Sequence, residues 1–222
     1  MVELVSRGDQ MKDFPMFTTE FGVASLVMKE IPYQGCAYII IRDALQPEEL
    51  LRECVSFCRM CGAERAYATG HEILHDKPYF TAIVEMRCAR ETLPDTDASL
   101  FPVQEKTLRD WLDIYNKKIV SVPNGAWMTE ADGKKMLERG DGYFVHRGGN
   151  LLGIGMAAGD TIDWVASVQP GAGRDVLLAL NHALTEETVV LTVSDRNEKA
   201  LKLYEELGFL KVKEISRWYQ VF

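Results

Sequence analysis

The sequence lacks any apolar run long enough to span a bilayer, and its first residues, MVELVSRGDQMKDF, are too polar for the core of a signal peptide. These two absences make the cytoplasm the expected location and a membrane an unexpected partner. The sequence also lacks an excess of basic residues, because its formal net charge is -8 at pH 7. Binding to a phosphate backbone needs a basic surface, so we expect no nucleic acid partner. An acidic surface attracts cationic amines, although only as a weak field effect.

Cysteines are few and odd in number: the chain has five, and reduced thiols are expected without a secretion signal. Three of them, in the stretch CVSFCRMC, have the spacing that holds an iron–sulfur cluster in radical-SAM enzymes. The residues Pro47–Ala63 instead predict a continuous helix, on which Cys54, Cys58 and Cys61 form one apolar stripe of buried thiols. An iron–sulfur enzyme stays as an alternative, which a brown colour after anaerobic purification would reveal.

Two histidines lie four residues apart, the spacing of a paired metal site on a helix. His71 and His75 are flanked by Gly70 and Pro78, however, and both of these residues disfavour a helix. We therefore expect no metal ion.

The composition is that of a globular protein, with 47% hydrophobic and 26% charged residues, and 222 residues suit one large domain or two small ones. No internal repeat is apparent in the letters. The stretch ETLPDTDASLFP, Glu91–Pro102, carries two prolines and small polar residues and reads as a linker. The sequence thus predicts an N-terminal domain over 1–95 and a C-terminal domain over 101–222.

The C-terminal half predicts two helices, three strands, a helix, a strand, a helix and two final strands. Such an order indicates an α+β fold, a mixed and mostly antiparallel sheet flanked by helices. The glycines Gly148 and Gly149 mark a hairpin turn. The expected segments before the last helix are Val103–Ile119, Met128–Leu137, Gly142–Arg147, Leu151–Ala158, Thr161–Val168, Arg174–Leu184 and Thr188–Val193, and Phe209–Phe222 is expected to form the final strands.

The N-terminal half is shorter in elements and predicts a smaller α+β domain. Its order is strand, strand, helix, strand, strand, with a turn at Tyr33, Gln34 and Gly35 between the first two. The expected segments are Val23–Glu30, Ala37–Arg42, Pro47–Ala63, Arg65–Thr69 and Phe80–Arg87.

The most specific stretch is NEKALKLYEELGF, which runs from Asn197 to Phe209. Its apolar residues recur at the spacing of one helix face, Asp195 is placed to cap the helix start, and Gly208 is placed for a left-handed stop. The order Asn, Ala, Leu-Tyr, Leu-Gly-Phe resembles the last conserved segment of the GNAT N-acetyltransferase superfamily. The N-terminal half, by the same resemblance, is a candidate for a degenerate GNAT-like half.

This resemblance implies that Asn197 and Ala200 flank acetyl-CoA, and that the Tyr204 hydroxyl protonates the departing CoA sulfur. A phenol is a plausible proton donor to a thiolate, because its pKa is near 10. A core position is the alternative for Tyr204. A helix-start residue is the alternative for Asn197.

A second stretch, SVQPGAGRDVLL, joins a predicted strand to a predicted helix. Glycines let backbone amides approach an anion, and a helix N-terminus adds partial positive charge. The stretch resembles the GNAT pyrophosphate loop but departs from it in two places: Pro170 directly precedes Gly171, and Asp175 replaces a small residue. A carboxylate there favours the helix dipole but repels pyrophosphate. The expected acetyl-CoA contacts are Ser167, Val168, Gly171, Ala172, Gly173, Arg174, Asp175 and Val176, together with Asn197, Ala200 and Tyr204.

In the resembling family, backbone amides polarise the thioester carbonyl where the third strand splays from its neighbour, here roughly Ala166–Val168. The sequence does not identify a general base. Asp163, His146 and Glu85 are candidates, and a chain of waters is an alternative.

The resemblance therefore implies an N-acetyltransferase that uses acetyl-CoA as co-substrate and transfers to a primary amine by direct attack. The acceptor, a small molecule or a peptide, is open, and a homodimer is an open expectation. The rival interpretation is a GNAT-like module that no longer catalyses and serves as a sensor or binding scaffold.

Overall fold

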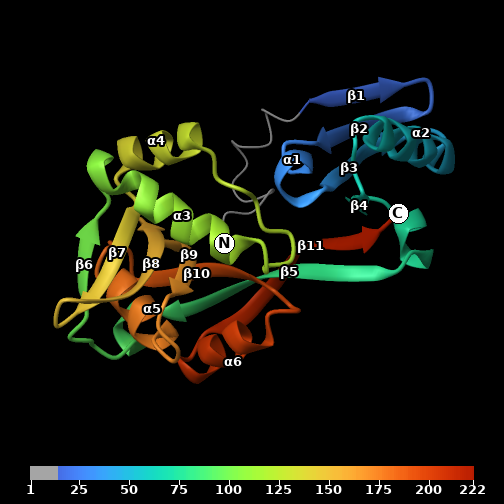
Figure 1. Ribbon diagram of the computed structural model, residues 1–222. Helices are drawn as coiled ribbons and strands as arrows, with labels where there is room; N and C mark the ends of the chain where they lie inside the picture. Colours follow the sequence, from blue (N-terminus) through green and yellow to red (C-terminus); the bar gives the residue numbers. More distant parts are fainter. Residues whose placement is uncertain (1–14) are drawn as a thin grey trace. The chain divides into compact units, whose positions relative to one another are not determined.

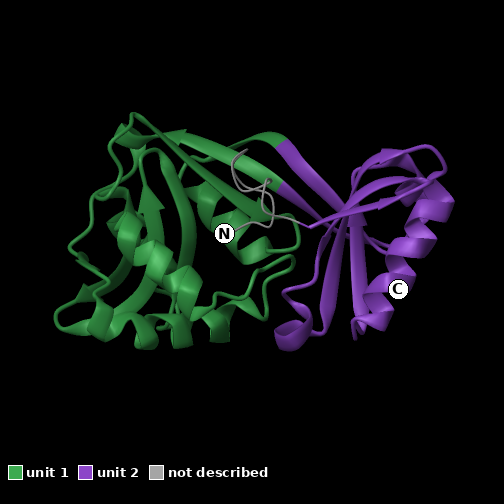
Figure 2. Cartoon of the chain, turned by 90° about the horizontal axis from the view of Figure 1, so that it is seen from above, with its two compact units in different colours: residues 1–3, 84–213 green, residues 4–83, 214–222 purple. Residues whose placement is uncertain are grey.

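The structure, a computed structural model, describes residues 15–222, and the N-terminal segment judged too polar for a signal peptide lies outside them (Figure 1). The described chain forms two compact units (Figure 2). We call residues 84–213 the C-terminal unit, and residues 15–83 with 214–222 the N-terminal unit. The strands β5 (Tyr79–Ala89) and β11 (Leu210–Gln220) each begin in one unit and end in the other. Among the described residues, no helix is long and apolar enough to cross a membrane.

The sheet of the C-terminal unit has the strand order β5, β10, β9, β8, β7, β6. The strands β9 and β10 are parallel, whereas the pairs from β6 to β9 are antiparallel. The fold class predicted from the sequence, a mixed and mostly antiparallel sheet flanked by helices, is confirmed. The strands after β5 are β6 (Ser99–Pro102), β7 (Gly142–Arg147), β8 (Asn150–Ala158), β9 (Thr161–Ser167) and β10 (Thr188–Ser194).

Four helices cover this sheet, α3 and α4 on one face and α5 and α6 on the other (Figure 1). Their bounds are α3 (Leu108–Ile119), α4 (Glu130–Arg139), α5 (Gly173–Asn181) and α6 (Glu198–Glu206). A capping box starts α4, since the Thr129 side chain accepts from the Asp132 amide and the Asp132 carboxylate accepts from the Thr129 amide.

Glycines in β8 set how closely α5 approaches the sheet. A Cβ on Gly153 would collide with the backbone carbonyl oxygen of Ala166, and one on Gly155 would lie 2.8 Å from that of Trp164, both in β9. Backbone atoms cannot move aside as the end of a side chain can, so β8 needs glycine at these positions, where Val176 and Leu180 of α5 also pack. This close packing fixes the start of α5 relative to the end of β9.

The N-terminal unit has the strand order β1, β2, β3, β4, and Tyr219 near the end of β11 pairs with Ala68 of β4. The apolar side of α2 packs on one face of this sheet, against alternate residues of β3 such as Ala37, Ile39 and Ile41. The elements are β1 (Met16–Thr19), β2 (Gly22–Val27), α1 (Ile31–Gln34), β3 (Cys36–Ala44), α2 (Pro47–Met60), β4 (Arg65–Thr69) and a 3₁₀ turn at Glu72–Asp76.

The two units share an arrangement of strands and helix that the amino-acid sequence does not reveal. In the N-terminal unit, β1, β2 and β3 are antiparallel neighbours, and α2 then leads to β4, which is parallel to β3. In the C-terminal unit, β7, β8 and β9 are antiparallel neighbours, and α5 leads to β10, which is parallel to β9. Both units therefore contain three antiparallel strands followed by a helix crossover to a parallel fourth strand.

Some sequence-based expectations were wrong. The stretch Glu91–Pro102 is not only a linker, because Ser99–Pro102 is strand β6 and pairs with β7. Its proline is tolerated because β6 is an edge strand, where an amide donor is dispensable. The segment after Phe209 forms the single long strand β11 rather than two strands. The predicted domains, 1–95 and 101–222, stay a prediction, while the two compact units divide the chain after residues 83 and 213.

The cysteine-rich stretch forms the predicted helix α2. Cys54 and Cys58 are buried in the core of the N-terminal unit, and burial raises the pKa of the Cys54 thiol to about 12 and that of Cys58 to about 11. Cys61 is exposed, which corrects the expected stripe: it follows the last helical residue and turns away from the core. The described residues contain no group of three or more His, Cys, Asp or Glu side chains placed to hold a metal ion.

Candidate functional site

The sheet of the C-terminal unit opens between β9 and β10. Across these parallel strands, Val190 of β10 pairs with Thr161 and Leu191 with Ile162, which are the first two residues of β9. Beyond Ile162, β9 continues to Ser167 and, within the described residues, its recorded pairing is with β8. An opening at the carboxyl ends of neighbouring parallel strands is a common place for a ligand.

The backbone of β9 determines which amides face this opening. The Val168 amide donates to the Leu152 carbonyl at 2.8 Å, so it belongs to the pairing with β8. Alternate residues of a strand direct their amides to opposite neighbours, so Ala166 also faces β8 and Ser167 faces the opening. Within the stretch expected to polarise a carbonyl, Ser167 is therefore the residue whose amide points the right way.

The predicted pyrophosphate loop joins β9 to α5, whose first residue is Gly173. Gly171 has a φ of +82°, in the left-handed region, and a Cβ there would meet nothing within 4 Å. Conformation rather than crowding therefore requires glycine at this position. Ala172 precedes the helix and makes no side-chain cap, so the first amides of α5 have no capping side chain. The Arg174 side chain is exposed.

Asp175 lies in the first turn of α5, where the sequence suggested that its charge would repel pyrophosphate. Its Oδ1 lies 2.7 Å from Nη2 of Arg147, at the end of β7, and Arg147 Nε lies 2.6 Å from Oδ1 of Asp97. The hydrogen bond and charge of Asp175, followed by the charge of Asp97, raise the pKa of Arg147. The Asp175 carboxylate is therefore paired with a cation. Sequence reasoning missed Arg147, because 28 residues separate it from Asp175.

The helix α6 begins at Glu198, directly after its cap, Asn197. The Asn197 Oδ1 accepts a hydrogen bond from the Ala200 amide at 3.3 Å, so Asn197 rather than Asp195 caps this helix. The predicted left-handed stop is present, since Gly208 has a φ of +87° and the next amide, of Phe209, donates to the Tyr204 carbonyl at 2.9 Å.

Tyr204 is buried on the inner face of α6, with 8% of its surface exposed. Its ring packs on Phe209, with ring centroids 5.8 Å apart. Burial raises the pKa of the Tyr204 hydroxyl to about 12, because the charged phenolate would lose its hydration. Among the described residues, none forms a hydrogen bond with this hydroxyl, so its proton is not committed to a protein acceptor.

The two sequence motifs lie side by side in the fold. A Cβ added to Gly173 would lie 3.5 Å from Cδ2 of Leu203, which is an ordinary van der Waals distance. The start of α5 thus lies close to α6, beside the residue that precedes Tyr204. The structure brings together the glycine loop, the first turn of α5 and the Tyr204 helix, which the sequence placed about twenty residues apart.

The three candidate general bases lie on different strands. Asp163 is on β9 itself. His146 is on β7, two strands from β9, which corresponds to roughly 10 Å of sheet. Glu85 is on β5, which neighbours β10, and its carboxylate oxygens lie 2.7 Å from Arg87 and 3.3 Å from Lys213. His146 therefore lies away from the opening, and the Glu85 carboxylate is held in two ion pairs.

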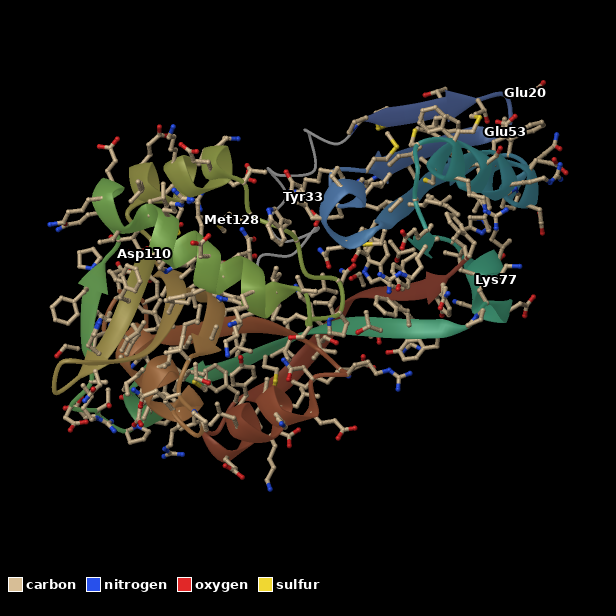
Figure 3. The ribbon with its side chains drawn as sticks, viewed as in Figure 1. Glu20, Tyr33, Glu53, Lys77, Asp110 and Met128 are labelled. Carbon is tan, nitrogen blue, oxygen red and sulfur yellow. The ribbon has the colours of Figure 1, made fainter. Side chains whose placement is uncertain are left out.

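The connection between α3 and α4 is held by hydrogen bonds from α3. Asn116 donates to the Met128 carbonyl at 2.9 Å and accepts from the Met128 amide at 3.0 Å. The Tyr115 hydroxyl donates to the Ala126 carbonyl at 3.0 Å. In Figure 3, the label of Met128 locates the end of this connection, just before α4, and the label of Asp110 locates α3. The sequence did not predict these hydrogen bonds, because Asn116 and Tyr115 resemble ordinary residues of an amphipathic helix.

Comparisons with known proteins bear on the fold. No family model and no curated protein matches the chain. Among solved structures, a protein of unknown function from Staphylococcus epidermidis has a TM-score of 0.61 at 11% identity and covers 98% of this chain and 97% of its own. A GCN5-related N-acetyltransferase from Sphaerobacter thermophilus has a TM-score of 0.55 at 12% identity, covering 89% and 75%.

A third neighbour is a tandem GNAT protein from the clavulanic acid biosynthesis pathway. Its TM-score is 0.52 at 11% identity, and the match covers 90% of this chain and 78% of that protein. At such identities a likeness establishes the fold alone. The chain has a fold shared with GCN5-related N-acetyltransferases, and the likeness extends well beyond residues 101–222.

Proposed function

We propose that this protein is an N-acetyltransferase that moves an acetyl group from acetyl-CoA to a primary amine by direct attack. The observation that supports this most is the proximity of Gly173 to Leu203, where an added Cβ would come within 3.5 Å of Cδ2. It places the start of α5 beside the Tyr204 helix, at the opening between β9 and β10. The GNAT-like fold supports the same class of reaction.

The first turn of α5 suits the CoA pyrophosphate. Its amides have no capping side chain, and the partial positive charge of a helix start favours an anion. Arg147 balances the Asp175 carboxylate, so the acidic residue in this turn does not present an uncompensated charge. The residues present therefore fit a phosphate group despite the departures of the loop from the family pattern.

The Ser167 amide faces the opening, where it is suited to polarise the thioester carbonyl as negative charge develops on its oxygen. The neutral amine attacks the carbonyl carbon, and the carbon–sulfur bond then breaks. Tyr204 donates its hydroxyl proton to the leaving thiolate. The proton lost by the amine returns to the phenolate through water, so protons balance over a turnover. With a pKa of about 12, Tyr204 is protonated at neutral pH, as a donor must be.

The N-terminal unit is proposed to be a second, degenerate GNAT-like half. Its strand and helix arrangement repeats that of β7 to β10, and one structural neighbour is a tandem GNAT protein. It is not expected to bind CoA. Only Leu45 and Gln46 separate β3 from α2, and the first turn of α2 carries Glu48 and Glu49. A loop without glycine and two carboxylates disfavour pyrophosphate.

A non-catalytic GNAT-like module is the second candidate. The positions of His146 and Glu85 favour it, since neither is placed to accept a proton from an amine in the opening. Such a module would bind acetyl-CoA without transferring the acetyl group.

An acetyl-transfer assay separates the two. The protein would be incubated with acetyl-CoA and a panel of small amines, amino acids and peptides, and products would be detected by mass spectrometry. We expect an acetylated product from at least one amine. Replacing Tyr204 with Phe should lower kcat by about a hundredfold, the usual contribution of a general acid, at unchanged affinity for acetyl-CoA. Binding without any product across the panel would favour the non-catalytic module.

A further inference from the structure

A hollow lies at the edge of the C-terminal unit, beside strand β6. It has a volume of about 420 Å³, within the range of pockets that hold small molecules. Strand β6 ends the sheet, so the hollow sits at an open edge. It is lined by Ser99, Phe101, Pro102, Gln104, Thr107, Phe144, His146, Gly148 and Gly149.

This hollow is separate from the proposed transfer site. Arg147 reaches Asp175, so it points to the sheet face that carries α5. Since side chains alternate along a strand, Phe144 and His146 point to the opposite face. Three strand spacings, roughly 14 Å, separate β6 from β9. A ligand here would therefore leave the opening between β9 and β10 accessible.

Aromatic rings form the walls. The Phe101 ring meets the His146 ring edge to face at a centroid distance of 5.1 Å, and the Phe144 ring lies 6.3 Å from His146. Phe101 is 52% exposed, although it is one of the large apolar residues of the chain. An aromatic side chain with this exposure on an edge strand offers a surface on which a flat ligand can stack.

None of the described residues that line the hollow carries a formal charge when His146 is neutral. Gln104 and Thr107 are engaged with each other, because the Gln104 amide donates to the Thr107 hydroxyl at 3.1 Å and the hydroxyl donates to the Gln104 carbonyl. An ionised ligand would lose hydration here without gaining an opposite charge. The lining therefore favours an uncharged ligand.

His146 contributes a ring nitrogen to the wall. Its Nδ1 is buried and has no hydrogen-bond partner among the described residues. Its Nε2 also makes no hydrogen bond to them, but it is not among the buried atoms, so it is open to a ligand or to water. A nitrogen at the wall of an aromatic hollow can orient a flat ligand through one hydrogen bond.

We propose that the hollow beside β6 binds an uncharged, planar heteroaromatic molecule, which stacks against Phe101 and Phe144 and hydrogen-bonds to Nε2 of His146. The ligand is defined by three properties of the lining: aromatic walls, absence of formal charge and one accessible ring nitrogen. This site is additional to acetyl transfer and does not depend on it.

Benzimidazole is a suitable probe, because it is flat and offers both a donor and an acceptor to Nε2. Indene, which has the same shape but no nitrogen, is the matched control ligand. Titrations of the full-length protein would be followed by the amide resonances of residues 99–107 and 142–149. We expect saturable shifts confined to these segments with benzimidazole, and weaker binding of indene.

Two variants test the contacts. Phe101→Ala removes an exposed ring, so the fold should be retained, and we expect it to weaken both ligands by about fivefold. His146→Phe keeps a ring and removes the nitrogens, and we expect it to weaken benzimidazole but not indene. Met60→Ala, at a residue that is 75% exposed in the N-terminal unit, is the control and should change neither affinity.

Absence of saturable shifts at millimolar benzimidazole would overturn the proposal, as would binding that Phe101→Ala leaves unchanged. The competing occupant is a second copy of the chain at the β6 edge. If the wild type sediments as a dimer that Phe101→Ala converts to a monomer, and benzimidazole does not bind, this edge is a subunit interface and the proposed ligand site is wrong.

Discussion

Nη2 of Arg147 lies 2.7 Å from Oδ1 of Asp175, and this pair joins the end of β7 to the first turn of α5. It places a cation beside the one acidic residue of the proposed pyrophosphate turn. The pair is partly exposed, with 38% of the Arg147 side chain and 29% of the Asp175 side chain accessible. Its expected role is therefore to adjust the charge at the turn rather than to stabilise the fold.

Replacing Arg147 with Gln should weaken acetyl-CoA binding by about fivefold, because Asp175 would then present an uncompensated charge to pyrophosphate. Asp175→Asn in the same chain should restore the affinity, and Asp175→Asn alone should bind at least as tightly as the wild type. The four dissociation constants form a double-mutant cycle. Equal losses from Arg147→Gln with and without Asp175→Asn would show that Arg147 acts independently of Asp175.

Alanine substitutions at Gly171 and Gly173 should change the free energy of unfolding by different amounts. Gly171→Ala should lower the free energy of unfolding by about 1 kcal/mol, because φ is +82° there and a Cβ disfavours the left-handed region. Gly173→Ala should be close to neutral, since its new methyl would meet Leu203 at an ordinary 3.5 Å. Urea unfolding of both variants checks this. A larger loss at Gly173 than at Gly171 would contradict the loop geometry.

Tyr204 should make stability depend on pH above pH 10. Its pKa is about 12 in the folded chain, while an unfolded tyrosine ionises near pH 10. The neutral phenol thus favours the folded state below pH 10, and this contribution is lost as pH rises toward 12. At pH 11 the expected loss is about 1 kcal/mol. Tyr204→Phe should be less sensitive between pH 9 and pH 11, and an identical loss in both proteins would show that Tyr204 is not the cause.

Thiol reactivity tests the cysteine assignment. Only Cys61 is exposed among the five free cysteines, and burial raises the pKa of Cys54, Cys58 and Cys88. Ellman's reagent should therefore label one thiol rapidly in the folded protein and five in denaturant, and Cys61→Ser should abolish the rapid phase. Two or more rapid thiols in the wild type would mean that at least one of the four cysteines buried in the structure is accessible.

Local chemistry explains why α6 was predictable from the sequence. Gly208 ends the helix in the left-handed region, as its position predicts, and this stop depends on residues within four positions. The cap is also local, although Asn197 supplies it rather than the predicted Asp195. The sequence also contains the information for a single strand β11, since Leu210–Gln220 has no glycine or proline that would favour a turn.

Features that depend on tertiary pairing were not predictable. The Arg147–Asp175 pair forms only when β7, β8 and β9 align under α5. The arrangement shared by the two units is a matter of strand direction, which no residue identity encodes. Strand β6 was read as a linker because its short exposed sequence carries proline, and only its pairing with β7 reveals it. The edge hollow likewise depends on Phe101 lying opposite Phe144.

The most direct test of the proposed function is a calorimetric titration of acetyl-CoA into the wild-type protein, with free CoA as the comparison. We predict micromolar affinity with one site per chain, because the start of α5 suits pyrophosphate whereas the start of α2 carries Glu48 and Glu49. Absence of binding heat at millimolar acetyl-CoA would contradict both the transferase and the acetyl-CoA-binding module.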